Sequence, residues 1–140
     1  MLDEGGVVAL QTYAGLDEQH AYGPFVSTVV RHAGDGAGSL IGTYWSQGDL
    51  AVLRSLLEGA GLAPIQGHSR LGEVRFPSMD AFVRTEIQGT PLAARVDERT
   101  YGTIAAEVRT VLAAYEHPDG AVTLPIRACF IAGRKKGAAG

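Results

Sequence analysis

The residues of this chain that could carry chemistry are four histidines, one cysteine and an acidic pair, Asp17-Glu18. The histidines are His20, His32, His68 and His117, and no two stand four positions apart, the spacing that places two metal ligands on one helix face. His20 follows the acidic pair in the loop that leaves a predicted strand, where open α/β sheets bind their ligands. A small enzyme built on His20 and Asp17 is therefore one hypothesis. The alternative is structural, because acidic residues also stabilise the first turn of a helix.

The remaining patterns that could indicate catalysis or cofactor binding are weak. No serine lies in a G-x-S-x-G elbow, so a hydrolase triad has no support. Cys129 falls within an apolar strand, where a thiol behaves as a small hydrophobe. Gly34 to Gly38 spell G-x-G-x-G, but a predicted helix precedes them where a dinucleotide site needs a buried strand. We therefore expect a flexible surface loop there and no metal site in the chain.

Composition narrows the class of protein. The 140 residues carry a net charge of −3 and are 46% hydrophobic, which is enough for one globular domain with its own core. No apolar stretch is long enough to span a membrane, and a mildly acidic chain is a poor ligand for nucleic acid. The single cysteine suits a reducing compartment, so we expect a cytoplasmic protein. The basic run at 134–136 adjoins a glycine-rich end, and residues 134–140 are expected to form a disordered tail.

The hydrophobic periods predict an α/β fold of three strands and four helices. The run Val7–Tyr13 is almost wholly apolar, which is typical of a strand buried on both faces. Further strands are expected at 63–76, with a possible break at one of its glycines, and at 122–132, where Pro125 should lie at a bulge or an edge. The helices are expected to begin near Tyr22 and after the caps Asp49 (or Ser46), Ser78 and Asp97. The second should turn four leucines inward: Leu50, Leu53, Leu56 and Leu57.

Several segments, in order, resemble a known family. Asp3–Gln11 is similar to a Pro-Gly-Gly turn and its following strand, although Glu4 stands in place of the proline. Leu16–Tyr22 is similar to the segment that leaves that strand, and Gly48–Leu62 to a helix ending in "AGF". Val74–Arg84 resembles a lid helix. Together they resemble the C-terminal half of class I S-adenosylmethionine-dependent methyltransferases, of the ubiquinone-biosynthesis-like small-molecule type.

The resemblance implies a partial domain of a Rossmann-like, seven-stranded sheet. This chain would supply the last three strands, with the final one inserted antiparallel between the other two. The implied segments are a buried strand at 1–15, acceptor-side helices at 16–62, a strand at 63–76, lid and packing helices at 77–117, and the final strand at 118–133. The glycine loop and the acidic residue that hold S-adenosylmethionine would lie upstream of Met1. The chain would then be truncated, would bind no cofactor by itself and would be inactive alone.

The same resemblance implies a pocket for a small-molecule methyl acceptor. Methyl transfer is an in-line displacement in which positioning supplies much of the rate, so no catalytic residue is assigned. The residues expected near the pocket are Tyr13, Gln19, His20, Tyr22, Tyr44, Trp45 and Arg84. For Tyr44-Trp45 the alternative is an aromatic staple onto the core.

An edge strand gives the alternative function. If Val7–Tyr13 lacks a neighbour on one side, the chain should expose a flat apolar edge that invites pairing. The expected partners are a separately encoded N-terminal half or a second copy of the chain. The alternative to an enzyme is therefore a non-enzymatic binding or assembly module derived from the same fold.

Overall fold

A computed structural model of the protein describes residues 2–137, which form three strands and five α-helices. The strands are β1 (Val7–Tyr13), β2 (Leu62–Phe76) and β3 (Val122–Lys135). The α-helices are α1 (Tyr22–Ala33), α2 (Asp35–Gly42), α3 (Leu50–Gly59), α4 (Met79–Gln88) and α5 (Glu98–Val111). Short 3-10 turns connect them: η1 (Leu16–Glu18), η2 (Thr43–Trp45), η3 (Pro91–Ala94) and η4 (Ala113–Tyr115). The mixed α/β class predicted from the sequence is confirmed.

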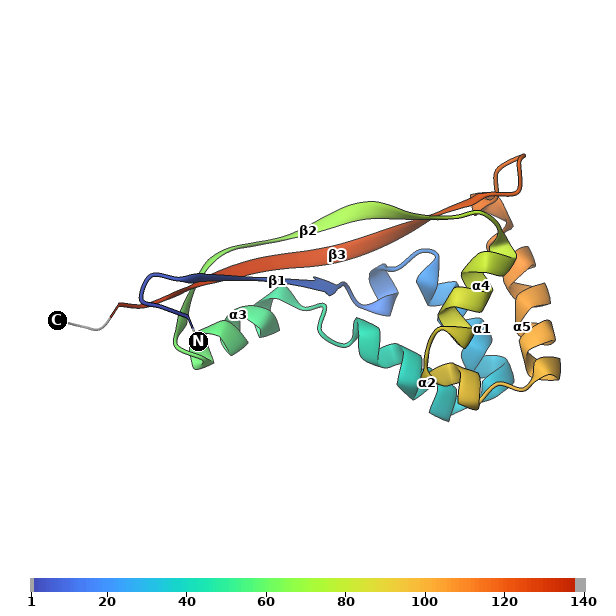
Figure 1. Ribbon diagram of the computed structural model, residues 1–140, viewed down its shortest axis with the longest axis horizontal. Helices are drawn as coiled ribbons and strands as arrows, with labels where there is room; N and C mark the ends of the chain where they lie inside the picture. The colour runs from blue at the N-terminus through green and yellow to red at the C-terminus, as the bar shows by residue number, and fades with distance from the viewer. Residues whose placement is uncertain (1, 138–140) are drawn as a thin grey trace. The chain divides into compact units, whose positions relative to one another are not determined.

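The three strands form one sheet in the order β1-β3-β2 (Figure 1). β1 pairs antiparallel with β3, in a register that runs from Val7 opposite Arg134 to Tyr13 opposite Ala128. The last strand in sequence is thus the middle strand of the sheet, as the family resemblance implies. β2 continues without a break through both of its glycines.

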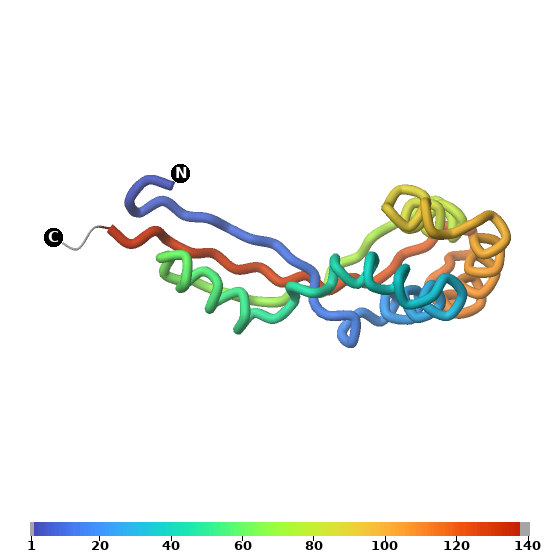
Figure 2. The backbone as a smooth tube through the Cα atoms, turned by 90° about the horizontal axis from the view of Figure 1, so that it is seen from below, coloured from blue at the N-terminus to red at the C-terminus, as the bar shows by residue number. Residues whose placement is uncertain are grey.

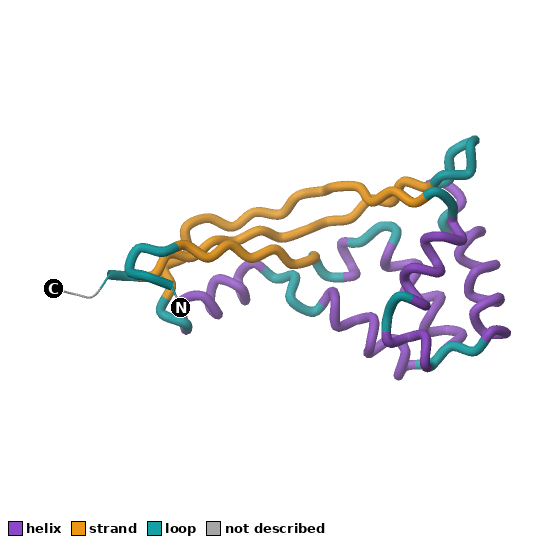
Figure 3. The backbone as a smooth tube through the Cα atoms, in the orientation of Figure 1, coloured by secondary structure: helices purple, strands orange, loops and turns teal. Residues whose placement is uncertain are grey.

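The chain divides into two compact units. Unit 1 comprises residues 1–15, 44–71 and 127–140, and unit 2 comprises residues 16–43 and 72–126. β2 and β3 each contribute one part to each unit. Among the described residues α3 is the one α-helix of unit 1, and the other four α-helices belong to unit 2. Figure 3 colours the helices purple and the strands orange.

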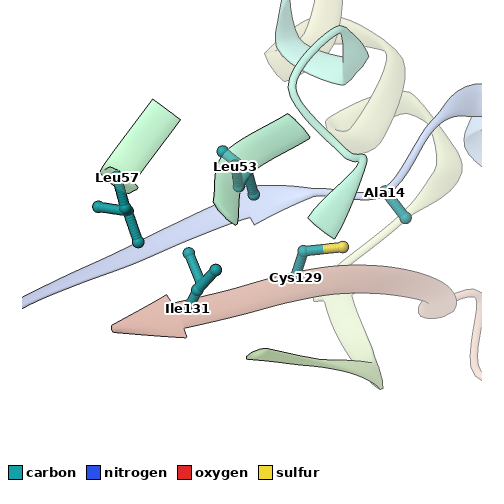
Figure 4. Close-up of a cluster of buried hydrophobic side chains, with 5 residues drawn as sticks. All are labelled: Ala14, Leu53, Leu57, Cys129 and Ile131. Atoms are coloured by element: carbon teal, nitrogen blue, oxygen red, sulfur yellow. The ribbon is translucent and has the colours of Figure 1, made fainter. Parts of the chain in front are cut away.

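In unit 1, α3 packs on one face of the sheet. Its cap is Asp49, whose carboxylate accepts hydrogen bonds from the backbone N–H groups of Ala51 and Val52. Leu53 and Leu57 point toward the middle strand and form a buried cluster with Ala14, Cys129 and Ile131 (Figure 4). Leu56, expected to face inward, is 57% exposed and does not belong to this cluster.

β1 is not buried on both faces, and the sequence prediction on this point is wrong. Val7 is 48%, Leu10 38% and Tyr13 37% exposed, while Val8 lies half-buried against the α3 cluster. The physical reason is that β1 pairs along one side only, with β3, and that α3 covers one face.

The start of β1 lies beside the end of β3, so the two ends of the described chain are neighbours (Figure 2). β3 continues to Lys135, two residues into the expected tail, and residues 138–140 of that tail lie outside the described residues.

In unit 2, the core is built on aromatic rings and branched aliphatic side chains. The ring of Phe82 packs edge-on against those of Tyr22, Phe25 and Phe76, with centroids 5.0–5.6 Å apart. Phe82 and Phe25 are fully buried. These contacts join α1, α4 and the end of β2 into one hydrophobic core.

The glycine-rich segment expected to be a loop is the helix α2. Gly34, at a φ of 85°, ends α1, and α2 begins at the next residue. A Cβ on Gly38 would come within 2.5 Å of a methyl group of Val30, so glycine at this position lets α2 pack closely on α1. Tertiary packing thus stabilises a helix that glycine disfavours intrinsically.

Pro125 lies within β3, beyond its pairing with β1. That pairing covers Ala128 to Arg134, so the missing N–H of the proline falls where β1 does not run alongside. This agrees with the expected edge position.

In the described part of the chain no helix has the length and apolar character needed to cross a membrane.

Candidate functional site

The loop that leaves β1 forms one wall of a groove on unit 2. Leu16 and Asp17, from η1, line one side, and residues between positions 23 and 30 of α1 line the other. The groove has a volume of about 650 Å³, within the range typical of small-molecule sites. Its α1 residues are Gly23, Pro24, Val26, Ser27 and Val30.

Gly23 sets the geometry of this groove. Its N–H donates to the carbonyl of Gln19, whose own N–H donates to the carbonyl of Leu16, so η1 runs directly into α1. A Cβ at position 23 would lie 2.9 Å from the Leu16 carbonyl oxygen, which is too close for any side chain. Glycine therefore allows η1 to approach the helix and bring Asp17 to the rim.

The groove is mainly apolar and has two polar groups. Asp17 supplies the one charged side chain and Ser27 the one hydroxyl among its lining residues. Both are exposed. This arrangement suits a small ligand with an apolar body and one hydrogen-bond donor, because the carboxylate accepts and the aliphatic side chains exclude water.

A partly buried carboxyl group lies beside the aromatic core of the same unit. The hydroxyl of Tyr22 donates a hydrogen bond to Oε1 of Glu86, at 3.3 Å. Burial raises the pKa of Glu86 above its usual 4.5, and the hydrogen bond from Tyr22 offsets part of that rise. A carboxyl with a raised pKa is the kind of group that transfers protons near neutral pH. Neither Glu86 nor Tyr22 is one of the groove residues.

The structure places four of the predicted site residues in unit 2. Gln19 and Tyr22 are buried, at 2% and 4% exposure, and act through the turn and the Glu86 hydrogen bond. His20 is exposed, and its backbone carbonyl accepts a long hydrogen bond of 3.5 Å from the Tyr115 hydroxyl. Arg84 is exposed on α4. None of these four lines the groove, although the carbonyl of Gln19 accepts the hydrogen bond from Gly23 that joins η1 to α1.

The other three predicted residues belong to unit 1. Tyr13 and Trp45 pack with ring centroids 5.3 Å apart and planes inclined by 47°. Trp45 is 8% exposed, whereas Tyr44 is 52% exposed. Trp45 is thus buried beside Tyr13, and none of the three residues lines the groove on unit 2.

Sequence reasoning missed the groove-lining residues of α1 and missed Glu86. A signal for Glu86 was present, since it stands four residues after Phe82 and so on the apolar face of its helix. Among residues 2–137 no group of three histidine, cysteine or acidic side chains could hold a metal ion.

The residues present do not fit S-adenosylmethionine as the family binds it. The glycine-rich stretch Gly34–Gly38 follows a helix, and its last glycine is closed off by Val30. A cofactor loop of this kind needs a preceding strand and open backbone.

Comparisons with known proteins give a fold-level likeness alone. The sequence matches no protein-family profile, and a search of curated proteins finds no match. Among solved structures, the chain is similar to a crystal structure from Bacillus halodurans described as a "putative methyltransferase", with 12% identity and a TM-score of 0.49. The match covers 97% of this chain and 58% of that one, so the chain spans less than two thirds of the length of the solved protein.

Proposed function

We propose that this chain is the acceptor-binding and lid portion of a class I S-adenosylmethionine-dependent methyltransferase that acts on a small molecule. In this proposal the cofactor is held by polypeptide other than the residues printed here. The protein works in the cytoplasm, which the single, buried thiol of Cys129 favours.

The observation that carries the proposal is the strand order β1-β3-β2 with β1 and β3 antiparallel. A last strand inserted in the middle of three is what the sequence resemblance implies for the end of the methyltransferase sheet. A simple meander would place the strands in sequence order, so chain connectivity alone does not produce this arrangement. The two long helical insertions, between β1 and β2 and between β2 and β3, correspond to the acceptor-side and lid segments.

The groove beside α1 is the site that we assign to the methyl acceptor. It follows β1 directly, and its apolar walls with one carboxylate suit an apolar molecule bearing a hydroxyl or amine. Asp17 would accept a hydrogen bond from that group and fix its orientation. Positioning and exclusion of water are the contributions that such a groove makes to a displacement reaction.

Calorimetric titration tests this function. The 140-residue chain should give no heat of binding with S-adenosylmethionine, whereas the chain extended by the residues encoded immediately upstream should bind it. In the extended protein, Ser27→Trp fills the groove and should abolish turnover, while Ser39→Trp on exposed α2 should leave it within about twofold. An upstream reading frame without a strand followed by a glycine loop contradicts the proposal.

The exposed edge of β1 favours a second candidate, an assembly module. β1 has seven residues, none of them charged, and carries neither the lysine nor the proline that usually protects an edge strand. Its outer backbone groups could pair with a strand from an N-terminal half or a second copy. Light scattering during size-exclusion chromatography separates the two candidates, because a monomer at all concentrations with a cooperative melt contradicts edge pairing.

A further inference from the structure

A second pocket lies within unit 2, where α4, η3 and α5 meet. It has a volume of about 450 Å³. Ile87, only 1% exposed, forms its floor, and Ala93 and Val96 add apolar surface. Gln88, Glu98 and Tyr101 contribute its polar groups. The pocket shares no residue with the groove beside α1.

Two side-chain caps fix the connection that forms one wall of this pocket. The hydroxyl of Thr90 lies 2.8 Å from the carbonyl oxygen of Glu86 and 3.1 Å from that of Ile87, and donates to them at the end of α4. The carboxylate of Asp97 accepts from the backbone N–H of Thr100 at 2.7 Å and starts α5. The Asp97 contact is an N-cap, which stabilises the first turn of a helix. The wall is therefore preorganised, which lowers the entropic cost of binding a ligand.

The polar groups of the pocket are available to a ligand. Within residues 2–137, the side chains of Gln88, Glu98 and Tyr101 make no hydrogen bond or ion pair. Glu98 is the one charged residue among those that line the pocket. The neighbouring Asp97 is already engaged as a cap, and Arg99 is not a lining residue.

The carboxylate of Glu98 and the ring of Tyr101 together favour a positively charged ligand. A carboxylate and an aromatic ring in one small pocket attract an ammonium group through charge and through the face of the ring. The aliphatic floor adds favourable contact with an apolar stem, because burying that stem removes apolar surface from water. We propose that this pocket binds an ammonium group carried on a short apolar stem, as in an arylalkylamine or the side chain of a lysine.

Titration of the ¹⁵N-labelled 140-residue chain by NMR tests the proposal. The probes are benzylamine, its neutral counterpart benzyl alcohol, and Nα-acetyl-lysine methylamide, which presents the same cation as a peptide would. Benzylamine should shift the amides of residues 87–101 saturably and bind at least fivefold more tightly than benzyl alcohol. Tighter binding of the lysine derivative than of benzylamine identifies a peptide as the source of the cation, and the reverse identifies a small amine.

Two variants and one control decide the role of the carboxylate and the ring. Glu98→Gln should weaken benzylamine binding about tenfold, and Tyr101→Leu should weaken it at least threefold. Glu116→Gln, an exposed carboxylate of the same unit outside the pocket, should bind like the parent chain. Glu98 is exposed, so its variant should fold normally, which unchanged amide spectra away from the pocket would confirm. Equal binding of the amine and the alcohol, equal loss in Glu116→Gln, or no saturable shift overturns the proposal.

Discussion

The hydroxyl of Tyr22, at the start of α1, donates a hydrogen bond to the carboxyl of Glu86 on α4, 64 positions later in the chain. Tyr22 is 4% exposed, and its ring packs edge-on against Phe82, one turn before Glu86. The pair places a titratable group beside the hydrophobic core of unit 2. Because burial disfavours a charged carboxylate, the stability of this unit should depend on pH.

The expected direction follows from the raised pKa of Glu86. The native state holds the proton more tightly than the unfolded chain, so this contribution to stability is fully present below pH 4.5 and is lost as pH rises through the raised pKa. Glu86→Gln removes the titration and should stabilise the protein above that range, by under about 1 kcal/mol since the group is partly solvated. Urea unfolding of the parent chain and of the variant between pH 4 and 8 measures this difference in the free energy of unfolding.

Tyr22→Phe provides the control for this pH dependence. It removes the hydrogen bond that lowers the pKa of Glu86, so the loss of stability with rising pH should extend to higher pH. A Glu86→Gln variant whose stability follows the parent curve at every pH contradicts the assignment.

Two glycines of unit 2 should respond oppositely to alanine. Gly23→Ala drives a methyl group against the Leu16 carbonyl, 2.9 Å away, and should cost about 1 to 3 kcal/mol through strain or displacement of η1. Gly102→Ala, inside α5 with nothing within 4 Å of the added atom, should stabilise by about 0.5 to 1 kcal/mol. Thermal unfolding of both variants checks the pair, and equal effects would mean that η1 does not approach Gly23 closely.

Two buried threonine hydroxyls give a second matched pair. The Oγ1 of Thr12 is buried and has no hydrogen-bond partner among the described residues, whereas that of Thr28 donates to the carbonyl of Pro24 at 3.0 Å. Thr12→Val should therefore stabilise unit 1 by about 1 kcal/mol, and Thr28→Val should destabilise unit 2 by a similar amount. Denaturant midpoints of the two variants should move in opposite directions; destabilisation by Thr12→Val would indicate that its hydroxyl has a partner.

The edge of β1 can be tested with two valines of similar exposure. Val7 on β1 is 48% exposed and Val52 on α3 is 49% exposed. If strands pair through the edge, Val7→Lys should reduce the association seen by light scattering at high concentration, because a charge blocks strand addition. Val52→Lys removes a similar amount of exposed apolar surface from α3 and should leave the association unchanged. Equal effects would assign association to general hydrophobicity.

The helices that the sequence predicts best are those with a local capping signal. Asp49, Ser78 and Asp97 each accept the expected backbone hydrogen bond at the start of a helix. The sequence did not predict the helix whose formation depends on tertiary contacts. The helix α2 depends on the close fit of Gly38 against Val30, and local propensity gives no sign of it.

Neither the exposure of β1 nor the position of the groove beside α1 can be predicted from one sequence, because both depend on tertiary contacts. An apolar strand indicates burial on both faces only if something covers both, and in unit 1 α3 covers one. The groove beside α1 depends on the approach of η1 to Gly23, a backbone contact with no residue pattern of its own. Of the predicted aromatic pair, Trp45 is buried and packs on Tyr13, whereas Tyr44 is 52% exposed.

Unit 1 also carries both of the chain's unique reporters, its single tryptophan and its single cysteine. Trp45 is 8% exposed, and the Cys129 thiol, 2% exposed, donates to the carbonyl of Gly48. Tryptophan emission and the rate of thiol alkylation thus both report the opening of unit 1 and do not report the unfolding of unit 2. Comparing them with far-ultraviolet circular dichroism, which is dominated by the helices of unit 2, would reveal whether the two halves of one polypeptide melt together or in succession.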